Sequence, residues 1–68
     1  MNVPKVRGLI AERYKTISNA AKSMGWKVDK LHRILRGERK TTTDDVLDMA
    51  TALGLLDSPE EIVAIFFK

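Results

Sequence analysis

Basic side chains recur along residues 27–40 at intervals that place several of them on one side of a helix. At 3.6 residues per turn, Arg33 and Arg36 point the same way as Asp29, with Lys30 beside them. Guanidinium and ammonium groups gathered on one surface bind phosphate, and a guanidinium can also hold a guanine edge through two hydrogen bonds. The pattern therefore indicates non-covalent binding of a polyanion.

The charges of the two halves of the chain differ in sign. The 68 residues carry a net charge of +3. Residues 1–40 hold 11 Lys/Arg and 3 acidic residues, a net +8, whereas residues 41–68 hold 1 Lys and 6 acidic residues, a net −5. A solubilising surface charge would explain the modest total, but the segregation favours a polyanionic partner on one face.

An acidic cluster at Asp44, Asp45 and Asp48 is the one alternative site for chemistry, as a metal centre. Asp44 and Asp45 fall where first-turn acids stabilise a helix, however, and Asp48 fits a solvated face. No nucleophile–base pair accompanies them, and the chain has no Cys and one His, which excludes disulfides and ordinary zinc sites. We expect no enzyme, no metal, no cofactor and no small-molecule substrate.

The chain shows no pattern typical of a membrane or secreted protein. Residues 1–10 lack the apolar stretch of a signal peptide, and the longest apolar run, residues 62–67, is far shorter than the roughly 18 residues that span a bilayer. The lack of Cys also fits a reducing compartment. We therefore expect a cytoplasmic protein.

The spacing of apolar residues predicts an all-α fold in a single domain, residues 1–68, because alternation over a strand length is missing. Thr16 suits the N-cap of the second helix, Thr42 and Asp45 have the spacing of a capping box, and Ser58 followed by Pro59 marks the start of the last helix. The five predicted helices cover residues 4–14, 17–24, 28–36, 43–53 and 59–67.

The second and third predicted helices have the spacing of a helix-turn-helix. Ala21 is small enough for a close helix crossing, and Gly25 suits the left-handed turn. Leu31 and Ile34 then face inward, and Gly37 ends the helix. A generic helical hairpin would explain Ala and Gly alone, but the full set with outward basic positions favours a DNA-binding motif.

With these residues, the whole chain resembles the Cro/CI-type (lambda repressor-like) helix-turn-helix repressors of phages and mobile elements. The resemblance implies a compact five-helix domain that binds operator DNA as a dimer, with residues 28–36 in the major groove. Two positions depart from the family. Ile17 stands where a DNA-touching Gln is common, and Ile10 and Leu35 stand where many members have a buried Arg–Glu pair, a swap that can be neutral or stabilising.

The candidate base-reading residues are Lys27, Val28, Asp29 and Arg33, at the start and on the outward face of the third helix. Arg33 suits guanine, and Val28 suits a thymine methyl group. Asp29 has three possible roles: accepting from a cytosine amino group, orienting a neighbouring Lys or Arg, or stabilising the helix dipole.

The candidate phosphate-binding residues are basic or hydroxyl-bearing and surround that face. For Thr42 we weight the capping role above a DNA contact. Val63 and Phe67 are candidates for a dimer contact, and Trp26 is expected to cover the core rather than to stack on bases. The phosphate set is Thr16, Lys22, Lys30, Arg36, Arg39, Lys40, Thr41 and Thr42.

The composition leaves one other function open, because a fold does not fix a function. The same helices could serve as a protein-binding module, such as an antitoxin or an anti-activator. Weak and salt-insensitive DNA affinity would distinguish that module from a regulator.

Overall fold

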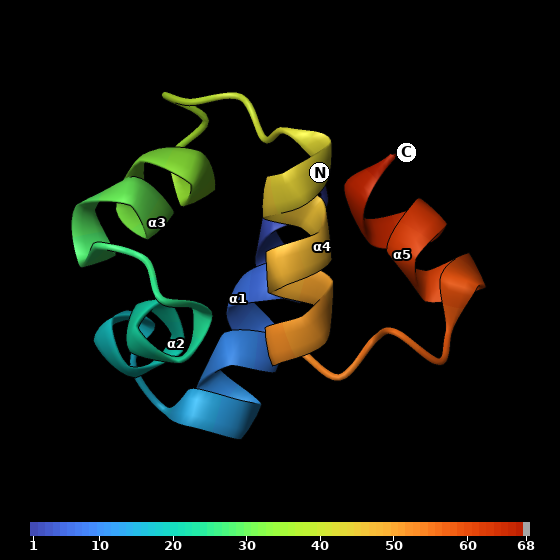
Figure 1. Ribbon diagram of the computed structural model, residues 1–68, viewed down its shortest axis with the longest axis horizontal. Coiled ribbons are helices and arrows are strands. Elements are labelled where there is room, and N and C mark those ends of the chain that lie inside the picture. Colours follow the sequence, from blue (N-terminus) through green and yellow to red (C-terminus); the bar gives the residue numbers. More distant parts are fainter. Residues whose placement is uncertain (68) are drawn as a thin grey trace.

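The computed structural model describes residues 1–67 and confirms the all-α prediction. No strand occurs among these residues, and each helix end lies within one residue of its predicted position. The helices are α1 (Val3–Tyr14), α2 (Ile17–Met24), α3 (Val28–Leu35), α4 (Thr43–Ala52) and α5 (Pro59–Phe66) (Figure 1).

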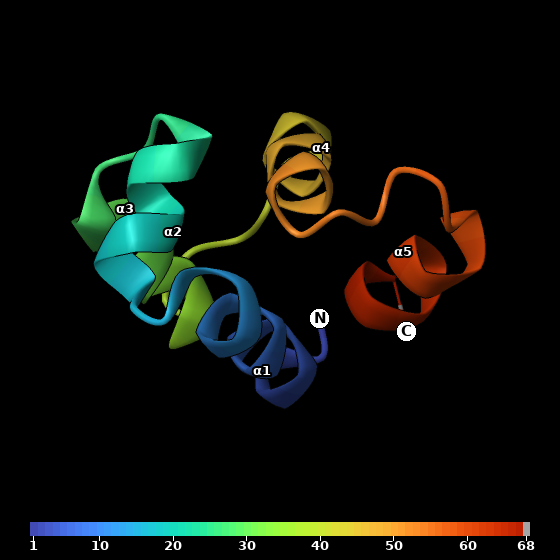
Figure 2. The ribbon, with the colours of Figure 1, turned by 90° about the horizontal axis from the view of Figure 1, so that it is seen from below.

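Helix α2 holds the arrangement together, because it packs against α1, α3 and α4. Helices α2 and α3 form one side of the molecule and α5 the other, with α1 and α4 between them (Figures 1 and 2). The chain start is fastened to α5 through the Asn2 amide, which donates to the Ile65 carbonyl at 2.6 Å. Base-reading candidates and dimer candidates therefore lie at opposite ends of the fold.

The predicted helix-end features can be compared with the structure one by one. The Thr16 hydroxyl accepts from the Asn19 amide at 3.1 Å, and Gly25 adopts the left-handed conformation with φ of 73°. Both hydrogen bonds of the Thr42–Asp45 capping box are present at 3.1 Å. Ser58 is the N-cap of α5 and Pro59 occupies the first turn, as predicted, but the Ser58 side chain makes no capping hydrogen bond.

The core is built from the predicted inward faces. Leu31, Ile34 and Leu35 bury one side of α3, and Ala21 at the helix crossing is 1% exposed. Ile10 and Leu35, which replace the ion pair found in many resembling proteins, are both buried in this apolar cluster. Helix α3 therefore presents a fixed apolar side to the protein and leaves its other side to solvent.

The α1–α2 junction contains a strained turn that the sequence did not predict. Lys15 has φ of 70° and ψ of −44°, and the Thr16 amide donates to the Tyr14 carbonyl at 2.8 Å, which is the geometry of the rare γ-turn. The Tyr14 hydroxyl donates to the Ala52 carbonyl at 2.6 Å. The Tyr14 hydroxyl thus fixes the end of α1 against the end of α4.

Candidate nucleic-acid interface

The four candidate base-reading residues lie at the start of α3 and on its solvent face. Lys27, Val28, Asp29 and Arg33 are exposed, and the Val28 side chain is 39% exposed despite being apolar. Asp29 and Arg33 lie roughly opposite the fully buried Leu31, whereas Val28 lies on nearly the same side as Leu31 and is exposed at the first residue of the helix. An exposed apolar side chain among charged ones is suited to contact with base edges, because these present both polar atoms and the thymine methyl group in the major groove.

Asp29 and Arg33 form an ion pair on this face. The Arg33 Nε lies 3.1 Å from Asp29 Oδ2, and both side chains are more than half exposed. Of the three roles open to Asp29, this geometry supports the orientation of Arg33. The pair is exposed and contributes little stability, about 0.5 kcal/mol or less, so its value lies in directing the guanidinium.

Most of the phosphate-binding candidates are exposed around α3. Two of the hydroxyls already serve as helix caps, those of Thr16 and Thr42, so the capping role we weighted for Thr42 is present. Arg36 pairs with Glu38 at 2.7 Å and is half exposed. Thr41 is half-buried, and the other exposed members are Lys22, Arg39 and Lys40.

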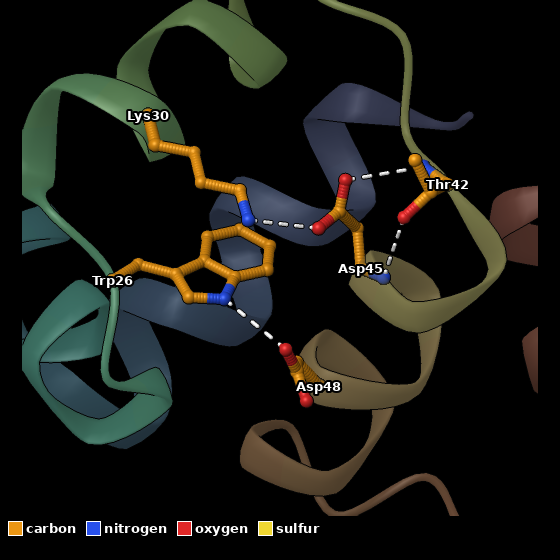
Figure 3. Close-up of polar contacts among 5 residues, drawn as sticks. All are labelled: Trp26, Lys30, Thr42, Asp45 and Asp48. Carbon is orange, nitrogen blue, oxygen red and sulfur yellow. Dashed lines mark hydrogen bonds and ion pairs between the residues drawn. The ribbon is translucent and has the colours of Figure 1, made fainter.

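Lys30, one of the phosphate-binding candidates, contacts protein groups in the structure. Its Nζ lies 2.8 Å from Asp45 Oδ1 on α4 and 4.1 Å from the centre of the Trp26 ring, and its side chain is only 26% exposed (Figure 3). An ammonium held by a carboxylate and an aromatic face is turned inward. The spacing along α3 was correct for Lys30, but the acidic end of α4 lies close enough to capture it.

Asp45 is the carboxylate at the centre of this cluster and is 4% exposed. Burial raises the pKa of this carboxyl, but the hydrogen bond from Lys30, the bonds with Thr42 and the charge of Lys30 together outweigh burial, so its pKa lies below the ordinary value. Asp45 is therefore ionised at neutral pH, and its charge is balanced by Lys30.

Trp26 takes the covering position that we expected. It is half-buried, packs against the core, and its Nε1 donates to Asp48 Oδ2 at 3.2 Å (Figure 3). Asp48 is exposed as predicted, but it is also the acceptor that fixes the indole ring. A ring occupied by Lys30 on one face and by Asp48 at its edge is a structural element rather than a surface for bases.

The family model described as a helix-turn-helix domain matches residues 6–63. The chain belongs to the helix-turn-helix domain family. Membership indicates a DNA-binding module, a type that is typically non-enzymatic. Comparisons with curated proteins and with solved structures gave no match.

In this helix-turn-helix domain the acidic cluster on α4 is used internally. Asp45 holds Lys30 and Thr42, and Asp48 holds Trp26, so two of the three carboxylates proposed as a metal site have protein partners. Within residues 1–67 no three His, Asp or Glu side chains gather where they could hold a metal ion. Over the same residues, no helix is both long and apolar enough to cross a membrane.

Sequence reasoning missed the contact between Lys30 and Asp45. The capping-box spacing identified Asp45 as an N-terminal residue of α4, and helical periodicity placed Lys30 beside the outward face of α3. Neither pattern predicts the conformation of residues 36–42, which connect the two helices and determine whether Lys30 and Asp45 come into contact. The burial of Asp45, which requires a cation nearby, is not evident from its capping-box spacing.

Proposed function

We propose that this helix-turn-helix domain is a sequence-specific regulator of transcription of the Cro/CI type, a repressor encoded by a phage or mobile element. Its five helices would act as one DNA-binding domain in the cytoplasm. The observation that carries the proposal is the solvent face of α3, where Arg33 and Val28 are exposed beside basic residues at the helix end. In this proposal α3 lies in the major groove of an operator.

Base reading would be shared between hydrogen bonds and one apolar contact. Arg33, oriented by Asp29, would donate to O6 and N7 of a guanine, and Val28 would pack on a thymine methyl group. Lys27, at the start of α3, would reach a neighbouring base or phosphate. These contacts would determine the preferred sequence.

Phosphate binding would come from the segments on either side of α3. Residues 39–42 lead directly to the N-terminus of α4, and Thr16 precedes the N-terminus of α2, so both places add amide donors to the side chains. Lys30 is left out because Asp45 holds it. The contributing side chains would be Thr16, Lys22, Arg36, Arg39, Lys40, Thr41 and Thr42.

Replacing Arg33 tests the assignment of base reading. Arg33→Ala should cost about 1–3 kcal/mol on the preferred duplex and relax the preference at one base position, since a two-pronged contact to guanine would be lost. The change is measured by titrating the variant against the preferred site and its single-base variants. Arg7→Ala, which removes an exposed charge from α1, is the matched control. Equal weakening on every sequence would make Arg33 a phosphate contact instead.

Dimerisation on DNA would use α5. Val63 on α5 and Phe67 directly after it are 45% and 63% exposed, and α5 lies on the other side of the molecule from α3 (Figure 1). Two copies joined there would place their α3 helices in half-sites about one helical turn apart.

Sedimentation of the protein–DNA complex tests this arrangement. We expect two copies per palindromic site for the wild type, and a shift toward one copy for Phe67→Glu, because a buried carboxylate in the contact is costly. Glu60→Gln, a change at an exposed residue of α5, should leave the stoichiometry unaltered. A one-to-one wild-type complex on a site without symmetry would contradict the dimer.

A second candidate function is favoured by one observation. Leu47 on α4 and Leu56 in the α4–α5 connection are 52% and 54% exposed, so with Val63 and Phe67 the second half of the chain carries four exposed large apolar residues. A protein-binding module such as an antitoxin or an anti-activator would use these residues. Such a module would show weak DNA affinity with little dependence on salt.

A further inference from the structure

One carboxylate joins the two parts of the proposed DNA-binding surface. Asp45 Oδ1 lies 2.8 Å from Lys30 Nζ on α3, and Asp45 Oδ2 accepts from the Thr42 amide at 3.1 Å (Figure 3). Lys30 precedes residues 36–42 and Thr42 ends them. Asp45 therefore holds a residue before this segment and the residue at its end, and the segment carries the cations Arg36, Arg39 and Lys40.

The surroundings make this link firmer than the other ion pairs. The side chain of Asp45 is 6% exposed and that of Lys30 is 26% exposed, whereas the Arg33–Asp29 pair is more than half exposed. The Trp26 ring also lies against the Lys30 ammonium at 4.1 Å, so the cation is held on two sides. A paired charge of this kind is costly to break, because its partner is left buried without compensation.

The link also joins helices that have a common neighbour. Helices α3 and α4 both pack against α2. The other two ion pairs of residues 1–67 lie within short stretches of chain, inside α3 or just after it. The Lys30–Asp45 pair is thus the ionic connection from the base-reading helix to the start of α4.

We infer that Asp45 is a positioning residue that sets the placement of the base-reading helix relative to the phosphate-binding residues 39–42. The inference rests on the proposed DNA-binding function. Specific recognition needs both parts to meet the duplex at once, since phosphate contacts fix the register in which bases are read. Non-specific binding needs only cations near phosphates and does not depend on that register.

The test compares Asp45→Asn with Asp44→Asn. Both variants remove one negative charge from the first turn of α4, but Asp44 is exposed and takes no part in the contacts among Asp45, Lys30 and Thr42. Each is titrated against the preferred duplex and a random duplex, after circular dichroism has shown that it is folded. We expect Asp45→Asn to lose about tenfold in affinity for the preferred duplex relative to Asp44→Asn, with equal affinities for the random duplex.

A second pair of variants leaves the cap intact in case Asp45→Asn does not fold. Lys30→Met should show the same selective loss, and Lys30→Arg should restore affinity by keeping the ion pair. If Lys30→Met lowers the affinity for both duplexes and reduces the salt dependence of binding by about one ion, Lys30 is a phosphate contact and the inference is overturned. Preferred-site affinity of Asp45→Asn equal to or above that of Asp44→Asn would also overturn it.

Amide chemical shifts without DNA separate this inference from the proposed function. Asp45→Asn should move the amides of residues 27–33 and of residues 39–42, whereas Asp44→Asn should move only those at the start of α4. If the wild type binds no duplex while the two variants show these shifts, the proposed regulator is refuted, but the role of Asp45 in positioning the two segments is retained. Shifts confined to the start of α4 in both variants would refute the positioning role whatever the DNA result.

Discussion

Raising the salt concentration from about 50 mM to about 200 mM should weaken duplex binding by a factor of about 10³ to 10⁵. Each cation that contacts a phosphate releases a condensed counterion, and that release is less favourable in concentrated salt. One copy offers the six exposed cations at the proposed interface, and a dimer offers two such sets. The cations are Lys22, Lys27, Arg33, Arg36, Arg39 and Lys40.

The measurement is a filter-binding or anisotropy titration at several salt concentrations. Replacing both Arg39 and Lys40 by Gln should reduce the slope of log K against log salt by about two ions per copy. Replacing Lys5 and Arg7 on α1 instead should leave the slope unchanged, because these exposed cations lie outside the proposed interface. A flat salt response of the wild type would refute DNA binding and favour the protein-binding module.

Leu31→Ala should lower the free energy of unfolding by about 2–5 kcal/mol. Leu31 is fully buried on α3, and truncating it removes apolar contacts and leaves a cavity in the core. A chain of this length has little stability in reserve. The variant should therefore be largely unfolded at room temperature and lose DNA binding through loss of the fold.

Val28→Ala is the matched control for this prediction, because it truncates an apolar residue that is 39% exposed on the same helix. Urea unfolding followed by circular dichroism should show a change of about 0.5 kcal/mol or less for Val28→Ala. Its effect should appear in base preference instead. Equal destabilisation by the two variants would contradict the assignment of Leu31 to the core and of Val28 to the exposed start of α3.

Features encoded within a few residues of the chain could be predicted from the sequence. Thr16, Gly25 and the Thr42–Asp45 box determine helix ends through bonds between residues at most four apart. Apolar spacing likewise placed Leu31 in the core, since helical periodicity fixes the direction of a side chain once the helix is known. These features also gave the helix-turn-helix domain and its exposed basic face.

Features that depend on the relative placement of helices could not be predicted in this way. Lys30 has the spacing of an outward cation, yet the path of residues 36–42 brings Asp45 within 2.8 Å of it. Asp48 is exposed as expected, but its bond to Trp26 crosses from α4 to the turn between α2 and α3. The γ-turn at Lys15 has no compositional sign either, because lysine is not favoured there.

The most direct test of the central claim is selection of bound duplexes from a pool of random DNA at moderate salt. The regulator that we propose should enrich one sequence with two inverted half-sites about one helical turn apart. Repeating the selection with Arg33→Ala should remove the preference at one position of each half-site. Recovery of the starting pool without an enriched sequence would contradict the claim that α3 reads bases.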